Sequence, residues 1–520
     1  MKDGIKTDVL VIGCGVSGAV AALTAADLGA SVLVITNTKD LKEGNTAYAQ
    51  GGIVYRGKNE SPELLVRDII QAGAGKSYPE AVRFLAEKGP PLVNKLLIRK
   101  HKVPFYRQKQ GQLDFTTEGA HSTHRIIHAA DMTGEAIITP LLSALKQHPR
   151  ITILPQTTAV DLLTLSHHSL NPCDVYESLT CMGVYALDQK KSRVMPLFAK
   201  ETILATGGLG QIYLHTTNPR GARGDGIALA YRAGARLINL EFIQFHPTAL
   251  FHQEGKGFLI TESLRGEGGV LLRKNGERFM DKIHPLGSLA PRDIVARAIQ
   301  DVMLTHDESC VYLDITHKDP EWIRRRFPHV FSTCLEYGID ITRNPIPVVP
   351  AAHYSCGGVA VDFMARTSIN RLWAVGEVSC TGIHGANRLA STSLLEGLLW
   401  GYEAGKNAAH NLHKNKDYYF PPIAPWKQEK EIVDPALIYQ DWLTIKYTMW
   451  NYVGLTRSTK RLERARHILR QLQQEVEEFY KKGILSDALI GLRNGVQTAI
   501  AVLFAAEENR DSRGCHYRID

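Results

Sequence analysis

The sequence has few cysteines, and they form no recognisable pairs. Eight cysteines are spread from Cys14 to Cys515 over 520 residues, with no CxxC motif and no closely spaced framework. Disulfide-rich frameworks are typical of small secreted proteins. The scattered cysteines argue against that class and predict a reducing compartment, the cytoplasm.

The sequence also lacks an uninterrupted hydrophobic run of membrane-spanning length. The nearest candidate is Val9 to Ala26, 18 uncharged residues that follow Lys2 and Lys6. A membrane-spanning helix needs about 20 mainly apolar residues, whereas three glycines divide this segment into a strand, a turn and a helix. We therefore expect neither a signal peptide nor a membrane span.

Low-complexity tracts, internal repeats and a strong charge imbalance are absent too. Hydrophobic residues make up 44% and charged residues 22%, which is ordinary for a globular protein and excludes disordered and collagen-like chains. The net charge of +8 would favour an anionic ligand, but it is also common in proteins without one. The 44 glycines fall in tight clusters, as they do where backbone approaches a large anionic cofactor.

The N-terminal segment predicts one βαβ unit. An apolar strand, the motif GxGxxG and an alanine-rich helix follow one another over residues 9–29, and a second strand covers 31–35. In this arrangement backbone NH groups and the helix dipole face a pyrophosphate, so the unit predicts dinucleotide binding. The second strand ends without the usual acidic residue, so Thr36 or Asn37 would hold the ribose hydroxyls.

Further along the chain, the composition predicts an inserted domain and a helical end. Strands are expected at 201–206 and 372–375, and the stretch 240–354 between them is rich in His, Arg and Gly. Prolines between 421 and 425 mark a linker into a helical region. There an apolar face recurs at spacings of three and four. Its members are Leu462, Ala465, Leu469, Leu472, Val476 and Phe479.

Three segments resemble a known flavoprotein family. They are EGNTAYAQGGI at 43–53, ATGG at 205–208 and WAVGEVSCTGIHGANRLASTSLLEG at 373–397. Together with the glycine motif they resemble the FAD-binding domain of the succinate dehydrogenase and fumarate reductase flavoprotein family. The resemblance implies an α/β plus α+β protein with non-covalently bound FAD. Its parts would be a split Rossmann-like FAD-binding domain of the glutathione-reductase-like class (1–239 and 355–424), an inserted α+β capping domain (240–354) and a C-terminal helical domain (425–520).

The same resemblance implies which residues hold the cofactor. The segment at 43–53 would lie along the flavin, Glu377 would hold ribityl or ribose hydroxyls, and Ser393 with Leu394 would approach the isoalloxazine ring. The implied FAD-binding residues are Gly13, Cys14, Gly15, Val16, Ser17, Gly18, Asn37, Asn45, Thr46, Ala47, Tyr48, Ala49, Gln50, Gly51, Gly52, Asp225, Glu377, Ser393 and Leu394.

Four more motifs resemble the dicarboxylate site of this family. They are EFIQFHPTAL at 241–250, TESLRGEGG at 261–269, APRDIVARAI at 290–299 and HYSCGGV at 353–359. A dicarboxylate needs cations or hydrogen-bond donors at both ends, and arginine offers a fork that matches a carboxylate. The resemblance implies that His353 and Arg388 hold one carboxylate and that His246 and Thr261 hold the other.

Three features favour a member of the family that acts on L-aspartate. TEGAHS places Glu118 where it could receive a substrate ammonium, Cys356 follows HYS where respiratory members usually have Met, and YVGLTRSTKRLERA at 452–465 with DSRGCH at 511–516 matches the C-terminal region. The implied reaction is oxidation of L-aspartate to iminoaspartate, with FAD reoxidised by O2 or fumarate. Quinolinate synthase would receive the product on the route to NAD.

In relatives the residue matching Arg292 gives or accepts a proton. Because a guanidinium stays protonated, we expect Arg292 to work through Glu262 and Arg265, which are spaced three apart, and to act electrostatically on aspartate. Asn45 occupies the position of the histidine that bonds covalently to FAD in membrane-bound relatives, and a carboxamide is no such nucleophile. The flavin is therefore expected to dissociate. No metal site is predicted.

Two departures from the family pattern and two alternative functions remain open. Thr392 replaces an asparagine and Asp511 replaces a glutamate. A soluble fumarate reductase or succinate dehydrogenase flavoprotein would use the same carboxylate ligands. An RNA-binding flavoprotein that modifies tRNA would suit the charge of +8 and the basic residues at 457–470, but it has no use for the dicarboxylate set, and such residues ordinarily form a solvated helix face. We expect no nucleic-acid partner.

Overall fold

The computed structural model describes residues 4–58, 60–129, 131–253, 257–414, 418–427 and 429–520. Its centre is a seven-stranded sheet in the order β6-β2-β1-β9-β8-β7, with β16 also paired to β9. The strands are β1 (Ile5–Ile12), β2 (Val32–Ile35), β6 (Ile151–Leu154), β7 (Thr157–Thr164), β8 (Cys181–Asp188), β9 (Arg193–Leu204) and β16 (Leu372–Ala374).

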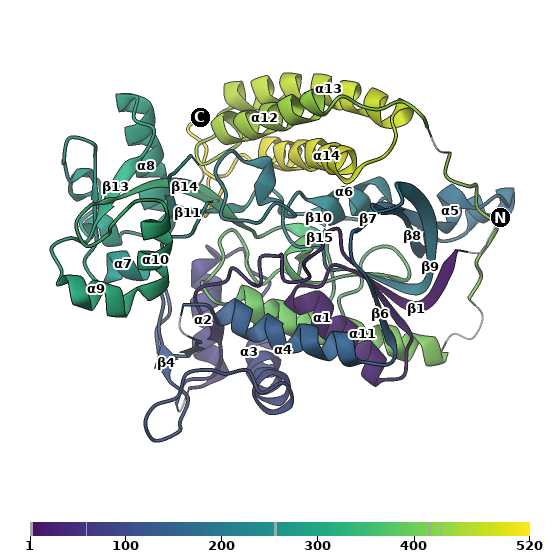
Figure 1. The fold of residues 1–520 in the computed structure, drawn as a ribbon, viewed down its shortest axis with the longest axis horizontal. Helices are drawn as coiled ribbons and strands as arrows, with labels where there is room; N and C mark the ends of the chain where they lie inside the picture. Colours follow the sequence, from purple (N-terminus) through teal and green to yellow (C-terminus); the bar gives the residue numbers. More distant parts are fainter. Residues whose placement is uncertain (1–3, 59, 130, 254–256, 415–417, 428) are drawn as a thin grey trace.

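The predicted βαβ unit lies at the centre of this sheet. β1, α1 (Val16–Asp27) and β2 follow one another, and β1 pairs in parallel with both β2 and β9. The sheet is mixed, because β8 pairs antiparallel with β7 and β9, and helices cover both faces of its parallel part, which is why the strands there are apolar. α1 lies on one face with α4 (Thr133–Gln147) and α11 (Ser393–Lys414), and α6 (Asp225–Arg232) lies on the other (Figure 1).

Three glycines of α11 explain why that helix packs closely on α1. Gly397, Gly401 and Gly405 recur every fourth residue and face α1. A Cβ on Gly401 would lie 2.5 Å from the carbonyl oxygen of Ser17, and one on Gly405 would lie 2.3 Å from that of Ala21. The segment that resembles flavoproteins at 373–397 is thereby brought beside the N-terminal glycine turn.

The inserted region forms a second sheet with its own hydrophobic core. Its strand order is β11-β14-β13-β12, and its helices cover it on the left of Figure 1. The elements are β11 (Ile243–Leu250), α7 (Ser263–Gly266), β12 (Val270–Leu272), α8 (Arg292–His306), β13 (Val311–Asp314), α9 (Pro320–Arg326), α10 (Pro328–Glu336) and β14 (Ile346–Ser355).

The C-terminal region is helical, as expected. α12 (Pro435–Tyr452), α13 (Thr459–Lys482) and α14 (Asp487–Glu508) pack together at the top of Figure 1. Each begins at a polar cap, and the Ser458 hydroxyl accepts a hydrogen bond from the Arg461 backbone NH. The predicted face of α13 is buried up to Val476. At the end of the helix Tyr480 is buried, and Phe479 is half-buried against the same hydrophobic cluster.

The remaining elements are short or flank the central sheet. They are β3 (Ile53–Val54), α2 (Pro62–Ala72), α3 (Pro79–Leu92), the π-helix Val93–Lys100, β4 (Phe115–Thr116), β5 (Ile126–Ile127), α5 (Leu165–His168), β10 (Leu237–Ile238), β15 (Gly358–Ala360), β17 (Ser379–Cys380) and the 3₁₀ turns Pro172–Tyr176, Gly210–Ile212, Phe279–Lys282, Gly287–Leu289 and Gly376–Val378.

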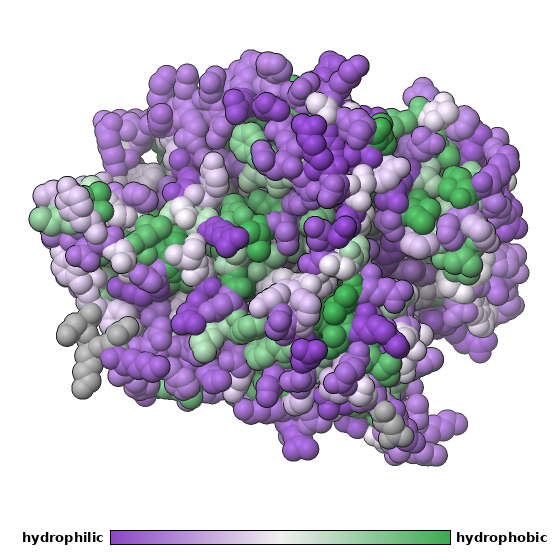
Figure 2. Space-filling view, turned by 180° about the vertical axis from the view of Figure 1, so that it is seen from behind, coloured by the Kyte–Doolittle hydropathy of each residue, from purple (hydrophilic) through white to green (hydrophobic). Residues whose placement is uncertain are grey.

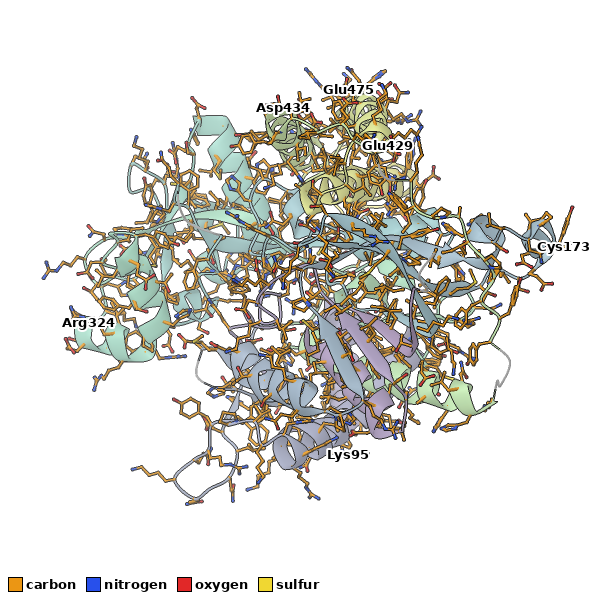
Figure 3. The ribbon with its side chains drawn as sticks, turned by 45° about the vertical axis from the view of Figure 1, so that its right-hand side comes forward. Lys95, Cys173, Arg324, Glu429, Asp434 and Glu475 are labelled. Atoms are coloured by element: carbon orange, nitrogen blue, oxygen red, sulfur yellow. The ribbon has the colours of Figure 1, made fainter. Side chains whose placement is uncertain are left out.

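Surface and cysteine features agree with a globular chain. Within the described ranges α14 alone is long and apolar enough to cross a membrane, and 72% of its apolar window is buried inside the protein. The face in Figure 2 is mostly hydrophilic, with hydrophobic side chains in small groups. All eight cysteines are free, and the exposed Cys173 lies at one edge (Figure 3). The domain boundaries given above remain predictions.

Candidate active site

One large cavity lies between the central sheet and the inserted domain. Its volume is about 1740 Å³, and its lining comes from segments between residues 12 and 446. Every residue nominated from the sequence lines this cavity except Gly18. The fold therefore brings together motifs that lie hundreds of residues apart in the chain.

The glycine turn forms one end of the cavity. Gly13 has φ of +105°, and a Cβ there would lie 2.2 Å from the Ala205 carbonyl oxygen. A Cβ on Gly18 would lie 2.2 Å from the Gly13 carbonyl oxygen, so Gly18 permits close packing of helix on turn. Gly15 is the N-cap residue of α1 and provides no side-chain cap bond. The Val16 NH donates to the Thr46 hydroxyl at 3.1 Å, and the Ser17 and Gly18 NH groups that follow it face the turn, which fits the pyrophosphate of FAD.

A buried carboxylate lies further along the cavity wall. The Asn45 amide donates to Glu377 Oε2 at 2.7 Å, and the Ser355 backbone NH donates to Glu377 Oε1 at 3.0 Å. A Cβ on Gly208 would lie 2.2 Å from Glu377 Oε1, so glycine there leaves room for this carboxylate. Burial raises the pKa of Glu377 to about 7. A buried acceptor with this pKa fits hydroxyl donors such as those of the FAD ribityl chain.

Asn37, expected near the ribose, and Asp225, an implied FAD-binding residue, differ in their hydrogen-bond partners. Asn37 lines the cavity and accepts a hydrogen bond from Gln189 through its backbone oxygen at 2.8 Å. Asp225 lines it too, but Arg223 binds its Oδ2 at 2.9 Å and Asn494 donates to its Oδ1 at 2.9 Å. Asp225 therefore holds α6 against α14 as well as facing the cavity.

Arg388 is a buried cation held mainly by neutral groups. Its Nε donates to Gln244 Oε1 at 3.1 Å, its Nη1 donates to Ser393 Oγ at 3.4 Å, and its guanidinium lies 4.8 Å from the centre of the Tyr354 ring. Burial and the nearby charge of Arg292 lower its pKa. An anionic ligand would relieve both effects, which makes Arg388 suited to bind a carboxylate.

Two neutral imidazoles lie beside this cation. The rings of His246 and His353 are 5.5 Å apart, and burial, followed by the charges of Arg292 and Arg388 respectively, keeps the pKa of each well below its ordinary value. Nδ1 of His246 lies 3.2 Å from the Thr248 backbone NH and 3.2 Å from the Thr248 carbonyl oxygen, and a neutral imidazole keeps one NH donor in either tautomer. The Thr217 hydroxyl lies 2.8 Å from Nδ1 of His353. Both imidazoles can therefore donate a hydrogen bond without adding charge.

Arg292, Glu262 and Arg265 form the predicted charged cluster. Arg292 begins α8, where a cation opposes the helix dipole, and it pairs directly with Glu262. Arg265 Nη2 lies 3.8 Å from Glu262 Oε1. Burial alone would lower the pKa of Arg292, but the charges of Glu262 and Glu118 outweigh it and raise the value. Burial lowers the pKa of Arg265 to about 10. Both arginines therefore remain charged at neutral pH.

Thr261 and Glu118 complete the set from two different loops. Thr261 precedes Glu262, and its hydroxyl lies 3.4 Å from the Ser263 hydroxyl. Glu118 Oε2 accepts a hydrogen bond from the Ser391 hydroxyl at 2.7 Å. A Cβ on Gly51 would lie 2.4 Å from Glu118 Oε1, so this carboxylate touches the segment expected along the flavin.

Several residues that were not predicted from the sequence hold the predicted site residues in position. They are ordinary polar or aromatic residues. Motif membership could have marked three of them, whereas Thr217 lies outside every motif. They are Thr217, Gln244, Tyr354 and Ser391.

The two departures from the family pattern have local explanations. Thr392 is buried outside the cavity lining and donates to the Leu389 carbonyl at 2.6 Å. The Asp511 backbone NH donates to Asn509, and the side chain is exposed. The tail that follows reaches the site, because the Cys515 thiol donates to Asn387, next to Arg388, at 3.2 Å.

Comparison with known proteins agrees with this geometry. Residues 8–394 match the model of an FAD binding domain, and residues 443–520 match that of the fumarate reductase flavoprotein C-terminus. L-aspartate oxidase 1 of Ralstonia nicotianae is 45% identical, over 99% of this chain and 95% of its own. L-aspartate oxidase of Pseudomonas aeruginosa is 44% identical, over 100% and 96%. A structure of quinol fumarate reductase from E. coli superimposes with a TM-score of 0.85 at 26% identity, covering 99% of this chain and 91% of that one. The predicted FAD domain is confirmed, and the chain belongs to the L-aspartate oxidase family of the succinate dehydrogenase and fumarate reductase flavoproteins.

Proposed function

We propose that the protein oxidises L-aspartate to iminoaspartate with a non-covalently bound FAD, which O2 or fumarate reoxidises. One observation carries the proposal. Glu118 lies in the same cavity as the carboxylate-binding residues His246, His353 and Arg388 and the dinucleotide turn. Two carboxylates and one ammonium, the three charged groups of aspartate, thus have matching partners in one place.

The residues would divide the work as follows. Arg388 and His353 bind one carboxylate, and His246 with Thr261 binds the other, which fixes Cα relative to the flavin segment at 43–53. When bound, FAD supplies the hydride acceptor. Glu118 holds the substrate ammonium and orients the C–N bond.

Arg292 and its partners would supply electrostatic support. Its guanidinium stays protonated at its nitrogens, because Glu262 and Glu118 raise its pKa. It therefore stabilises negative charge on the bound dicarboxylate. When fumarate is the acceptor, Arg292 would instead give a proton to the substrate carbon and regain it through Glu262 and Arg265, a role supported by their ion pairs.

The mode of cofactor binding follows from Asn45. Its carboxamide donates to Glu377 and is not a nucleophile, so the flavin should be held by hydrogen bonds and packing. The reducing cytoplasm is the compartment we propose, in agreement with eight free cysteines. Iminoaspartate hydrolyses in water, and its proposed recipient is quinolinate synthase, on the route to NAD.

An aerobic assay tests the substrate directly. The purified, FAD-loaded protein is incubated with L-aspartate, D-aspartate, L-glutamate or succinate, and peroxide is followed. We expect peroxide with L-aspartate well above the other three. Peroxide or dye reduction with succinate at an equal rate would instead support a soluble succinate dehydrogenase or fumarate reductase, the function that the quinol fumarate reductase likeness favours.

A further inference from the structure

The loop that carries Glu118 also carries a histidine that links two parts of the site. His121 Nδ1 lies 3.2 Å from Arg125 Nη1, and His121 Nε2 lies 3.0 Å from the Ala390 carbonyl oxygen. A guanidinium can only donate, so Nδ1 accepts. Nε2 therefore carries the proton and donates to Ala390, and the imidazole is a neutral bridge.

One end of the bridge is a rigid buried anchor. Arg125 is 0% exposed and forms ion pairs with Glu60 at 2.6 Å and Asp68 at 2.5 Å. Asp68 also accepts hydrogen bonds from the Ser122 backbone NH at 2.9 Å and from its hydroxyl at 2.8 Å. Because the arginine stays charged and is held by two carboxylates, its Nη1 is a fixed donor.

The other end leads to Glu118. Ala390 precedes Ser391, which has φ of +58°, a left-handed conformation that a residue other than glycine rarely adopts. The Ser391 hydroxyl accepts from the Gly52 backbone NH at 3.2 Å and donates to Glu118 Oε2 at 2.7 Å. Fixing the Ala390 carbonyl therefore helps to hold this strained residue, and with it the hydroxyl that orients Glu118.

We propose that His121 is a positioning residue for Glu118 and that it thereby determines the preference of the site for an α-amino acid over a plain dicarboxylate. The proposal rests on the function proposed above, in which Glu118 receives the ammonium. His121 acts through Ala390 and Ser391. A dicarboxylate without an ammonium binds Arg388, His246 and His353, which the bridge does not touch.

The charge state of the imidazole agrees with this role. Burial lowers the pKa of His121, the bond to Ala390 partly offsets it, and the charges of Arg125, Asp68 and Glu60 act in addition. A protonated Nδ1 would also face the Arg125 guanidinium donor directly. The neutral form is the one that makes both hydrogen bonds.

The test compares three variants of the FAD-loaded enzyme in two reactions. His121→Leu loses both hydrogen bonds, whereas His121→Gln keeps a donor for Ala390 and an acceptor for Arg125. His124→Leu is the matched control, because His124 lies on the same loop and is exposed. Aspartate oxidation and fumarate reduction by the reduced enzyme are measured on the same preparation, with kcat and KM separated.

We expect His121→Leu to lower kcat/KM for aspartate at least tenfold while fumarate reduction stays within about twofold of wild type. His121→Gln should restore most of the aspartate activity, and His124→Leu should change neither reaction. Equal losses in both reactions, or an unchanged aspartate rate in His121→Leu, would overturn the inference. If His121→Leu fails to hold FAD, His121→Asn takes its place, because its shorter amide reaches only one partner.

Glu118→Gln, measured alongside, separates the two proposals. A selective loss of aspartate oxidation in Glu118→Gln with no effect of His121→Leu would reject only the positioning role of His121. Equal losses of both reactions in Glu118→Gln would reject the role of Glu118 itself, and with it the basis of the proposed substrate preference.

Discussion

Replacing Arg388 tests how much of the substrate binding energy comes from this one carboxylate-binding arginine. Arg388 is 7% exposed, and Gln244 and the Tyr354 ring orient its guanidinium toward the cavity. Arg388→Ala leaves the substrate carboxylate buried without its charged partner. Truncating a buried, hydrogen-bonded charge commonly costs about 2–5 kcal/mol, which corresponds to a loss of about 30-fold to several thousand-fold.

Arg388→Lys sharpens the same test. Lysine keeps the charge but offers a point donor in place of the planar fork that lies over Tyr354. We therefore expect a loss between those of wild type and Arg388→Ala. Arg324→Ala is the control for removal of positive charge, because Arg324 is a half-exposed arginine on α9, outside the cavity lining (Figure 3).

The assay separates binding from chemistry. Peroxide formation gives kcat and KM for L-aspartate, and the inhibition constant of succinate reports carboxylate binding alone. Both KM and the succinate inhibition constant should rise in Arg388→Ala, with FAD content unchanged. A succinate inhibition constant within twofold of wild type would show that Arg388 does not bind a carboxylate.

Three further predictions concern the cofactor and the charged cluster. Acid precipitation should release all flavin as FAD, because Asn45 cannot form the covalent bond; yellow colour in the protein pellet would contradict this. Arg292→Lys should lower kcat more than it raises KM, since the lysine cannot match the paired geometry with Glu262, and a pure KM effect measured by initial rates would argue for simple binding. Glu377→Gln should stabilise the cofactor-free protein at pH 8 more than at pH 5. The unfolded carboxyl ionises near 4.5 and the folded one near 7, so between these values ionisation favours the unfolded state by up to about 3 kcal/mol. Equal changes in melting temperature at both pH values would show that Glu377 is not the group responsible.

The glycine turn illustrates what the sequence alone could predict. The order strand, GxGxxG, helix can be predicted because the turn between strand and helix needs glycine for conformational reasons. The structure has this order, and Gly13 adopts a conformation that only glycine adopts readily. Arg292, Arg388, His246 and His353 could be named because four motifs occur together. These side chains line one cavity because distant strands pair, as β11 does with β14, and such pairs join residues about a hundred positions apart.

Other features had no signal in the sequence. The strand order β6-β2-β1-β9-β8-β7 depends on which distant strands pair, and neither the hydrophobic period nor the composition of the sequence specifies these pairs. His121, Gln244 and Ser391 are common polar residues whose roles depend on which neighbour their side chains reach. The end of the α13 face illustrates a smaller limit. Alternating spacings of three and four drift from the helical period, so Phe479 lies at the edge of the face and is half-buried, and the burial of Tyr480 was not predicted.

The close packing of α11 on α1 has a consequence for the order in which the molecule is made. Ser17 and Gly401 touch through backbone atoms, yet 384 positions separate them. Ribosomes add about 5–20 residues per second, so roughly 20–80 s pass between synthesis of the two helices. During that interval the inserted domain can fold around its own core, while the apolar face of α1 stays exposed until α11 is made. Nascent chains shorter than residue 393 would therefore expose this face and should be the ones that chaperones bind.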